Sequence, residues 1–85
     1  MIYKIEVPDY NTDGIKTEWE YDFQITCSVA GDEVHLKANR AGLLSLASHL
    51  LTLAQEDVPD GTHIHYDDSN SLEDGSKGLI IERCT

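Results

Sequence analysis

The sequence has few basic residues, and this shortage is its most informative absence. Six lysines and arginines stand against 16 aspartates and glutamates, which gives a formal net charge of −10 at pH 7 with histidine neutral. Nucleic acids and anionic membranes are polyanions, so a field of this sign repels them. The balance disfavours both as partners and favours a basic protein partner, although acidity can also serve solubility alone.

Other absences narrow the class of protein. Cysteine occurs twice, at Cys27 and Cys84, which is too few for a disulfide scaffold. No run approaches the roughly 20 apolar residues of a membrane span, and no basic region followed by an apolar run marks a secretory signal. We therefore expect a single small domain over residues 1–85, in the cytoplasm, with both thiols reduced.

The motifs of common enzymes are also missing. No Gly-x-Ser-x-Gly nucleophile elbow occurs. The glycine-rich stretch from Asp74 to Gly78 lacks the spacing of a phosphate-binding loop, and no helix follows it. These absences disfavour nucleophilic catalysis and phosphate binding, and we expect no catalytic residue and no cofactor.

The clearest element present is a helix over residues 39–55. At 100° per residue, one half of its circumference collects apolar residues and the other half polar ones. Asn39 is a suitable N-cap, and Pro59 follows the end of the helix. We expect the apolar half to be buried against a sheet and the polar half to face solvent. The apolar half comprises Leu43, Leu44, Leu46, Ala47, Leu50, Leu51, Leu53 and Ala54, and the polar half Ser45, Ser48, His49, Thr52 and Gln55.

Alternation of apolar and polar residues predicts five strands. They cover residues 1–7, 19–29, 33–38, 62–67 and 79–84. The second is long for a strand, so we expect a bulge or bend within it. Gly31 permits a tight turn before the third strand, and the last two strands would pair as a hairpin. The expected fold is α+β, a two-layer sandwich in the order β-β-β-α-β-β with one helix packed on one face of a mostly antiparallel sheet.

Two histidines and an aspartate alternate along the strand that follows the helix. His63, His65 and Asp67 would share one face, with successive Cα atoms roughly 6.5 to 7 Å apart. Such a set can hold a divalent metal, so a metal-binding protein or a metal-dependent enzyme is the alternative function. No second histidine cluster follows, the one later cysteine is Cys84 near the end of the given sequence, and a fourth ligand would have to come from another strand. We therefore expect no metal site.

Acidic residues are concentrated between Glu56 and Asp74, where seven of 19 residues are aspartate or glutamate. These residues fall in loops around the short histidine-bearing strand, and loops on a rigid scaffold commonly carry binding residues. The alternative is that they are solvated turn residues, because aspartate favours turns. We predict that this stretch binds the partner, through Asp60, His63, His65, Asp67, Asp68, Glu73 and Asp74.

The second half of the chain resembles the immunity protein 32 family of bacterial polymorphic toxin systems. The resemblance covers approximately residues 33–83 and rests on LKANRAGLLSLASHLLTLAQ, a Pro-Asp-Gly turn, THIHYDD, a Ser-Leu…Gly-Ser element and a closing LIIE strand. The matching positions are Asn39, Gly42, Leu43, His65, Asp67, Asp68, Leu72, Gly75 and Ser76. The resemblance implies a cytoplasmic antitoxin that binds a cognate toxin domain and blocks it, without catalysis of its own.

The charge of the chain extends this implication to the kind of toxin. A toxin that attacks nucleic acid has a basic active-site cleft, and an acidic protein can occupy that cleft as a polyanion mimic. We therefore expect a basic, nuclease-like toxin as the partner. A third possibility is a subunit that dimerises through an exposed sheet edge, and the oligomeric state is left open.

Overall fold

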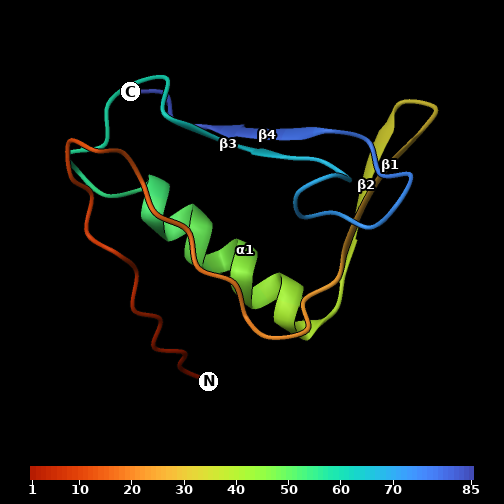
Figure 1. The fold of residues 1–85 in the computed structure, drawn as a ribbon, viewed down its shortest axis with the longest axis horizontal. Coiled ribbons are helices and arrows are strands. Elements are labelled where there is room, and N and C mark those ends of the chain that lie inside the picture. The colour runs from red at the N-terminus through yellow and green to blue at the C-terminus, as the bar shows by residue number, and fades with distance from the viewer.

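The computed structural model describes residues 1–85 and contains one helix and four strands (Figure 1). The elements are β1 (Ile25–Ala30), β2 (Glu33–Ala38), α1 (Arg40–Leu53), β3 (His63–Tyr66) and β4 (Leu79–Glu82). β1 pairs with β2 and β3 pairs with β4, both antiparallel, in two separate two-stranded sheets. The predicted α+β class and the predicted hairpin of the last two strands are confirmed. The structure contains no helix with the length and hydrophobicity needed to cross a membrane.

The element order and the single sheet predicted from the sequence differ from the structure. Residues 1–7 form no strand, so the order is β-β-α-β-β rather than β-β-β-α-β-β. The long second strand begins at Ile25, because the backbone turns at Tyr21 and Asp22, where Asp22 has a positive φ of 65°. The expected break within this strand is therefore present, and the residues before it do not enter a sheet.

Asn39 joins the first hairpin to the helix and caps α1, as predicted. Its side-chain Oδ1 accepts hydrogen bonds from the backbone N–H groups of Gly42 at 2.8 Å and of Gln24 at 3.0 Å. Its Nδ2 donates to the backbone carbonyl of Asp22 at 3.0 Å. A Cβ built on Gly42 would lie 2.6 Å from the backbone oxygen of Gln24. The start of the helix is therefore packed against the chain entering β1 too closely for any side chain at position 42.

The buried face of α1 is largely polar, so the prediction that its polar half faces solvent is wrong. Ser45, His49 and Thr52 are each at most 1% exposed. The reason is the leading segment, residues 8–24, which runs beside the helix in the opposite direction (Figure 1). A segment without a sheet partner still has backbone N–H and C=O groups that need hydrogen bonds. Polar side chains of the helix supply them.

Hydrogen bonds of this kind occur at both ends of the helix. Near its start, the Oγ atom of Ser45 accepts from the N–H of Glu20 at 2.8 Å. Just past its end, the Nε2 atom of Gln55 donates to the carbonyl of Pro8 at 3.0 Å. No buried side-chain nitrogen or oxygen lacks a hydrogen-bond partner. The polar side chains of α1 and of Gln55 thus provide hydrogen bonds that the leading segment would otherwise receive from a neighbouring strand.

The predicted apolar face of α1 is divided as a consequence. Leu46 and Leu53 are buried, whereas Leu43, Leu50 and Leu51 are 56, 51 and 48% exposed. Side chains on opposite sides of a helix cannot both face the same core. The orientation that buries the polar face therefore leaves these three leucines in solvent.

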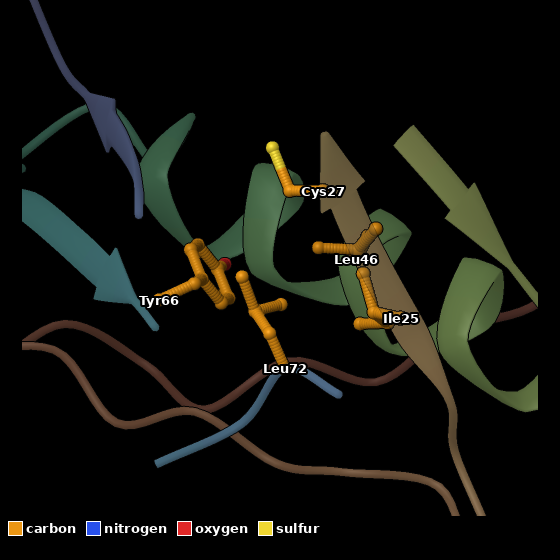
Figure 2. Packing of buried hydrophobic residues seen from close by; sticks show 5 residues of the cluster. All are labelled: Ile25, Cys27, Leu46, Tyr66 and Leu72. Atoms are coloured by element: carbon orange, nitrogen blue, oxygen red, sulfur yellow. The ribbon is translucent and has the colours of Figure 1, made fainter. Parts of the chain in front are cut away.

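The core lies where α1, β1, β3 and the connection after β3 meet (Figure 2). Its buried cluster comprises Ile25, Cys27, Leu46, Tyr66 and Leu72. The rings of Trp19 and Phe23 stack with their centroids 4.3 Å apart, and both pack against this cluster. A chain of this length buries a limited share of its surface, so each of these large side chains contributes substantially to stability.

The connection between β3 and β4, residues 67–78, is held against one edge of β1, and we call it the acidic loop. The N–H of Glu73 donates to the carbonyl of Ile25 at 2.9 Å. The N–H of Lys77 donates to the carbonyl of Cys27 at 2.8 Å. These bonds fix the acidic loop to the β1–β2 hairpin. In Figure 1 the loop extends from the β3–β4 hairpin to β1.

Candidate partner-binding surface

The seven residues predicted to bind a partner do not form one site. The acidic loop brings together Asp67, Asp68, Glu73 and Asp74. Asp60 lies at the opposite end of β3, where its Oδ1 atom accepts from the N–H of Thr85 at 3.1 Å. The length of β3 separates Asp60 from the acidic loop, so Asp60 belongs to a different part of the surface.

His63 and His65 are exposed on the outer face of β3. The Nδ1 atom of His63 donates to the carbonyl of Gly61 at 3.0 Å. The Nε2 atom of His65 lies 3.9 Å from a carboxylate oxygen of Asp67. No three histidine, cysteine, aspartate or glutamate side chains are arranged so that they could hold a metal ion. The geometry therefore gives no support to the alternative of a metal site on this strand.

Asp67 organises the acidic loop. Its Oδ1 atom accepts from the backbone N–H of Ser69 at 2.9 Å and from the hydroxyl of Ser69 at 2.7 Å. Its backbone carbonyl accepts from the N–H groups of Ser71 and Leu72 at 3.0 and 2.8 Å. The bond from the Ser69 hydroxyl is the main cause that lowers the pKa of Asp67. Asp67 therefore shapes the loop, and part of its carboxylate is already engaged within the chain.

The other acidic side chains of the loop are more available. Asp68 is exposed, and its Oδ2 atom accepts from the N–H of Gly75 at the long distance of 3.3 Å. Glu73 and Asp74 are exposed, and neither carboxylate takes part in an ion pair. An open surface hollow of about 340 Å³ lies beside them. It is lined by Phe23, Asp68, Ser69, Asn70, Ser71, Leu72 and Glu73.

This hollow has the chemistry of a site for a cationic side chain. Two carboxylates, from Asp68 and Glu73, accept charge-assisted hydrogen bonds from an ammonium or guanidinium group. Phe23, whose ring stacks on Trp19, also lines the hollow, and aromatic rings attract cations.

Several positions that carry the family resemblance serve the fold. Asn39 and Gly42 fix the start of the helix against the chain that enters β1. Leu72 is buried in the core. The Oγ atom of Ser76 accepts from the N–H of Cys27 at 3.2 Å, which holds the acidic loop to β1. Within the chain, these residues hold the start of the helix and the acidic loop in place.

The structure buries His49 completely, so the prediction that it faces solvent is wrong. Its Nε2 atom donates to the carbonyl of Glu18 at 2.8 Å, so the Nδ1 atom of the neutral ring accepts from the hydroxyl of Tyr66 at 2.8 Å. The ring of Trp19 meets it edge-on with centroids 4.5 Å apart. Burial lowers the pKa of His49 and raises the pKa of Tyr66 to about 12. The His49–Tyr66 pair is neutral and buried, and its hydrogen bonds link the leading segment, α1 and β3.

One signal in the sequence points to this buried polar face. No charged residue other than histidine occurs between Arg40 and Glu56, whereas the solvent face of a helix normally carries charges. Ser45, His49 and Thr52 are spaced to form one stripe along the helix. A stripe that is polar but uncharged is suited to hydrogen bonding within the protein.

The acidic loop is held by hydrogen bonds to β1, and loops positioned by a scaffold often carry functional residues. The family model for Immunity protein 32 matches residues 33–84, which is more than half of the chain, and the chain therefore belongs to that family. The family predicted from the sequence is confirmed. The match includes α1, β3, β4 and the acidic loop and excludes the leading segment. No curated protein and no solved structure matches the chain.

Proposed function

We propose that the protein is an immunity protein, an antitoxin that binds and blocks a cognate bacterial toxin domain and has no catalytic activity of its own. Membership of the Immunity protein 32 family is the observation that carries this proposal. Such a protein needs a surface complementary to its toxin and needs no catalytic group. It would act in the cytoplasm, where an unblocked toxin would meet the contents of its producing cell.

The proposed contact surface is centred on the acidic loop. Asp68, Glu73 and Asp74 anchor the toxin, and Asp67 holds the loop in shape. A lysine or arginine of the toxin enters the hollow lined by Asp68 and Glu73. The exposed His63 and His65 lie at the edge of this surface, whereas Asp60, at the other end of β3, lies outside it. Support comes from the exposure of these carboxylates and from the lining of the hollow.

The proposed toxin is basic and nuclease-like, because the whole chain carries a net charge of −10. A basic cleft that binds a nucleic-acid backbone attracts such a protein over a long range. Opposite charges of this kind raise association rate constants to about 10⁸ to 10⁹ M⁻¹s⁻¹ at low salt. Added salt screens the attraction, so it slows association more than it speeds dissociation.

The test uses the toxin domain encoded beside this protein. Association and affinity are measured by stopped-flow fluorescence and calorimetry at low and physiological salt. The Glu73→Lys/Asp74→Lys variant should bind at least about tenfold more weakly, because reversing a charge that contacts the toxin weakens binding more than reversing a distant charge does. The control is Glu6→Lys/Glu18→Lys, which changes the net charge equally at exposed positions outside the loop.

Each outcome has a defined meaning. A large loss in the loop variant with a small loss in the control supports the acidic loop as the contact surface. Equal losses would show that general charge steers binding and that the contact surface lies elsewhere. Absence of any complex with the neighbouring toxin domain would contradict the proposed function itself.

A further inference from the structure

Strand β2 has one edge that no other part of the chain covers. A two-residue turn closes the β1–β2 hairpin, so Ala30 and Glu33 form a hydrogen-bonded pair and every second residue of β2 bonds to β1. The N–H and C=O groups of Val34 and Leu36 therefore point away from β1. No loop or other segment forms a backbone hydrogen bond with them. The opposite edge of the hairpin, on β1, is occupied by the acidic loop.

The inward face of the hairpin is also uncovered near this edge. Val34 is 67% exposed and Leu36 is 42% exposed, although they lie on the same sheet face as the buried Cys27. Natural edge strands are commonly protected by a proline, a bulge, an inward-pointing charge or charged side chains, especially lysine. β2 reads EVHLKA and has no proline, no bulge and no inward-pointing charge; its two charged side chains, Glu33 and Lys37, have opposite signs and lie on the outer face. Its free edge is therefore able to accept another strand.

The charges on the outer face of β2 are complementary to a second copy of the same strand. Glu33 and Lys37 lie on either side of His35 on this face. Neither has an ion-pair partner in the structure, because the residues opposite them on β1 are Ala30 and Thr26. When two β2 strands pair antiparallel about His35, Glu33 of each copy lies opposite Lys37 of the other.

We propose that β2 is a dimerisation edge at which a second copy of this chain adds its own β2, with His35 next to the two-fold axis. Val34 of each copy and Leu36 of the other then form hydrogen-bonded pairs, each exchanging backbone N–H and C=O bonds. The Glu33–Lys37 pairs fall at positions without such bonds, where opposing side chains are closest. The contact uses the same patch on both copies and therefore closes as a dimer.

Other registers match less well. A shift by one residue would place the apolar side chains of the two copies on opposite faces of the joint sheet. A shift by two residues in one direction sets Glu33 opposite Asn39, whose side chain already caps the helix. A shift by two residues in the other direction sets Lys37 opposite Gly31. Only the register centred on His35 pairs both charges.

The dimer is expected to be weak. An edge contact between short strands is small compared with stable interfaces, and two chains that each carry −10 repel one another at long range. The dimer leaves the acidic loop free, because that loop lies on the opposite edge of the hairpin. The inference therefore does not depend on the proposed function.

The first test is sedimentation velocity over concentrations from about 10 μM to about 1 mM, the range in which a small interface can associate. We expect a monomer–dimer equilibrium. Glu33→Lys and Lys37→Glu should each weaken the dimer by about tenfold, since each creates like-charge pairs across the strands. The double variant Glu33→Lys/Lys37→Glu should restore it. Glu56→Lys is the control that matches the charge change of Glu33→Lys away from the edge.

The second test traps the register with a disulfide. Opposed residues at the axis have Cα atoms about 4.5 Å apart, which a disulfide can bridge. His35→Cys in a Cys84→Ser background should therefore form a covalent dimer under mild oxidation. Ser28→Cys in the same background is the control, because Ser28 is exposed on the same sheet face but one strand farther from the axis.

Three outcomes would overturn the inference. The first is a monomer at every concentration tested. The second is cross-linking of the His35→Cys variant no faster than that of the Ser28→Cys control. The third is a monomeric chain whose toxin binding is weakened by Glu33→Lys, which would assign the edge to the toxin instead.

Discussion

At the scale of single residues, buried hydrogen bonds decide how this chain is arranged. His49 connects the leading segment, through the carbonyl of Glu18, to β3, through the hydroxyl of Tyr66. A buried polar group that lost these partners would cost about 1 to 3 kcal/mol. The histidine therefore contributes stability only in its neutral form, which can accept from one partner while donating to the other.

This arrangement predicts a pH dependence that belongs to His49. Its pKa in the folded protein lies below its ordinary value of 6.5. As the pH falls through 6.5, the unfolded chain therefore binds a proton that the folded chain does not, and folding loses stability until the folded pKa is passed. The difference in unfolding free energy between the wild type and a His49→Gln variant should shrink as the pH falls from about 7 to about 5.

Urea unfolding at several pH values measures this difference. The variant is the appropriate reference because the remaining titratable groups are common to both proteins. A difference that stays constant across this pH range would contradict the buried, neutral state of His49.

At the scale of elements, the structure depends on which face of α1 is buried. The polar stripe faces the leading segment, and Leu43, Leu50 and Leu51 face solvent. How much a leucine of this helix contributes to the stability of the fold therefore depends on where it lies around the helix axis.

Leu46→Ala and Leu50→Ala form a matched pair that tests this orientation. Leu46 is buried in the core cluster, so its truncation should lower the unfolding free energy by about 2 to 4 kcal/mol. Leu50 is half exposed, and the same truncation should cost less than about 1 kcal/mol. Chemical denaturation of both variants measures the two effects. Equal losses would favour the orientation predicted from the apolar pattern.

The elements that depend on local signals were predictable from the sequence. Asn39 caps the helix, Gly31 sits in the hairpin turn, and the last two strands begin and end within two residues of their predicted limits. The leading segment was not predictable in this way. Its alternation resembles a strand, but one edge of β1 is taken by β2 and the other by the acidic loop. Which segments pair with β1 is decided by distant parts of the chain, so the local sequence of the leading segment does not reveal it.

The candidate site was also predictable only in part. The concentration of acidic residues in the stretch after the helix is plain in the sequence, and four of them do share one loop. The sequence does not reveal that Asp67 is engaged in shaping that loop, or that β3 separates Asp60 from it. It also does not reveal the free edge of β2, because an edge is defined by what fails to pair with it.

At the scale of the whole molecule, two surfaces lie on opposite edges of the first hairpin. The acidic loop adjoins β1, and the free edge belongs to β2. Membership of the Immunity protein 32 family makes toxin binding the central claim for the molecule, and the acidic loop is the surface proposed for it. The second surface can associate with another copy without covering the first.

The most direct measurement of this claim is protection of cells that express the neighbouring toxin domain. Co-expression of the wild-type protein should restore growth. The Glu73→Lys/Asp74→Lys variant should protect less than the Glu6→Lys/Glu18→Lys control at equal protein levels. Cells that die despite abundant, folded wild-type protein would contradict the account.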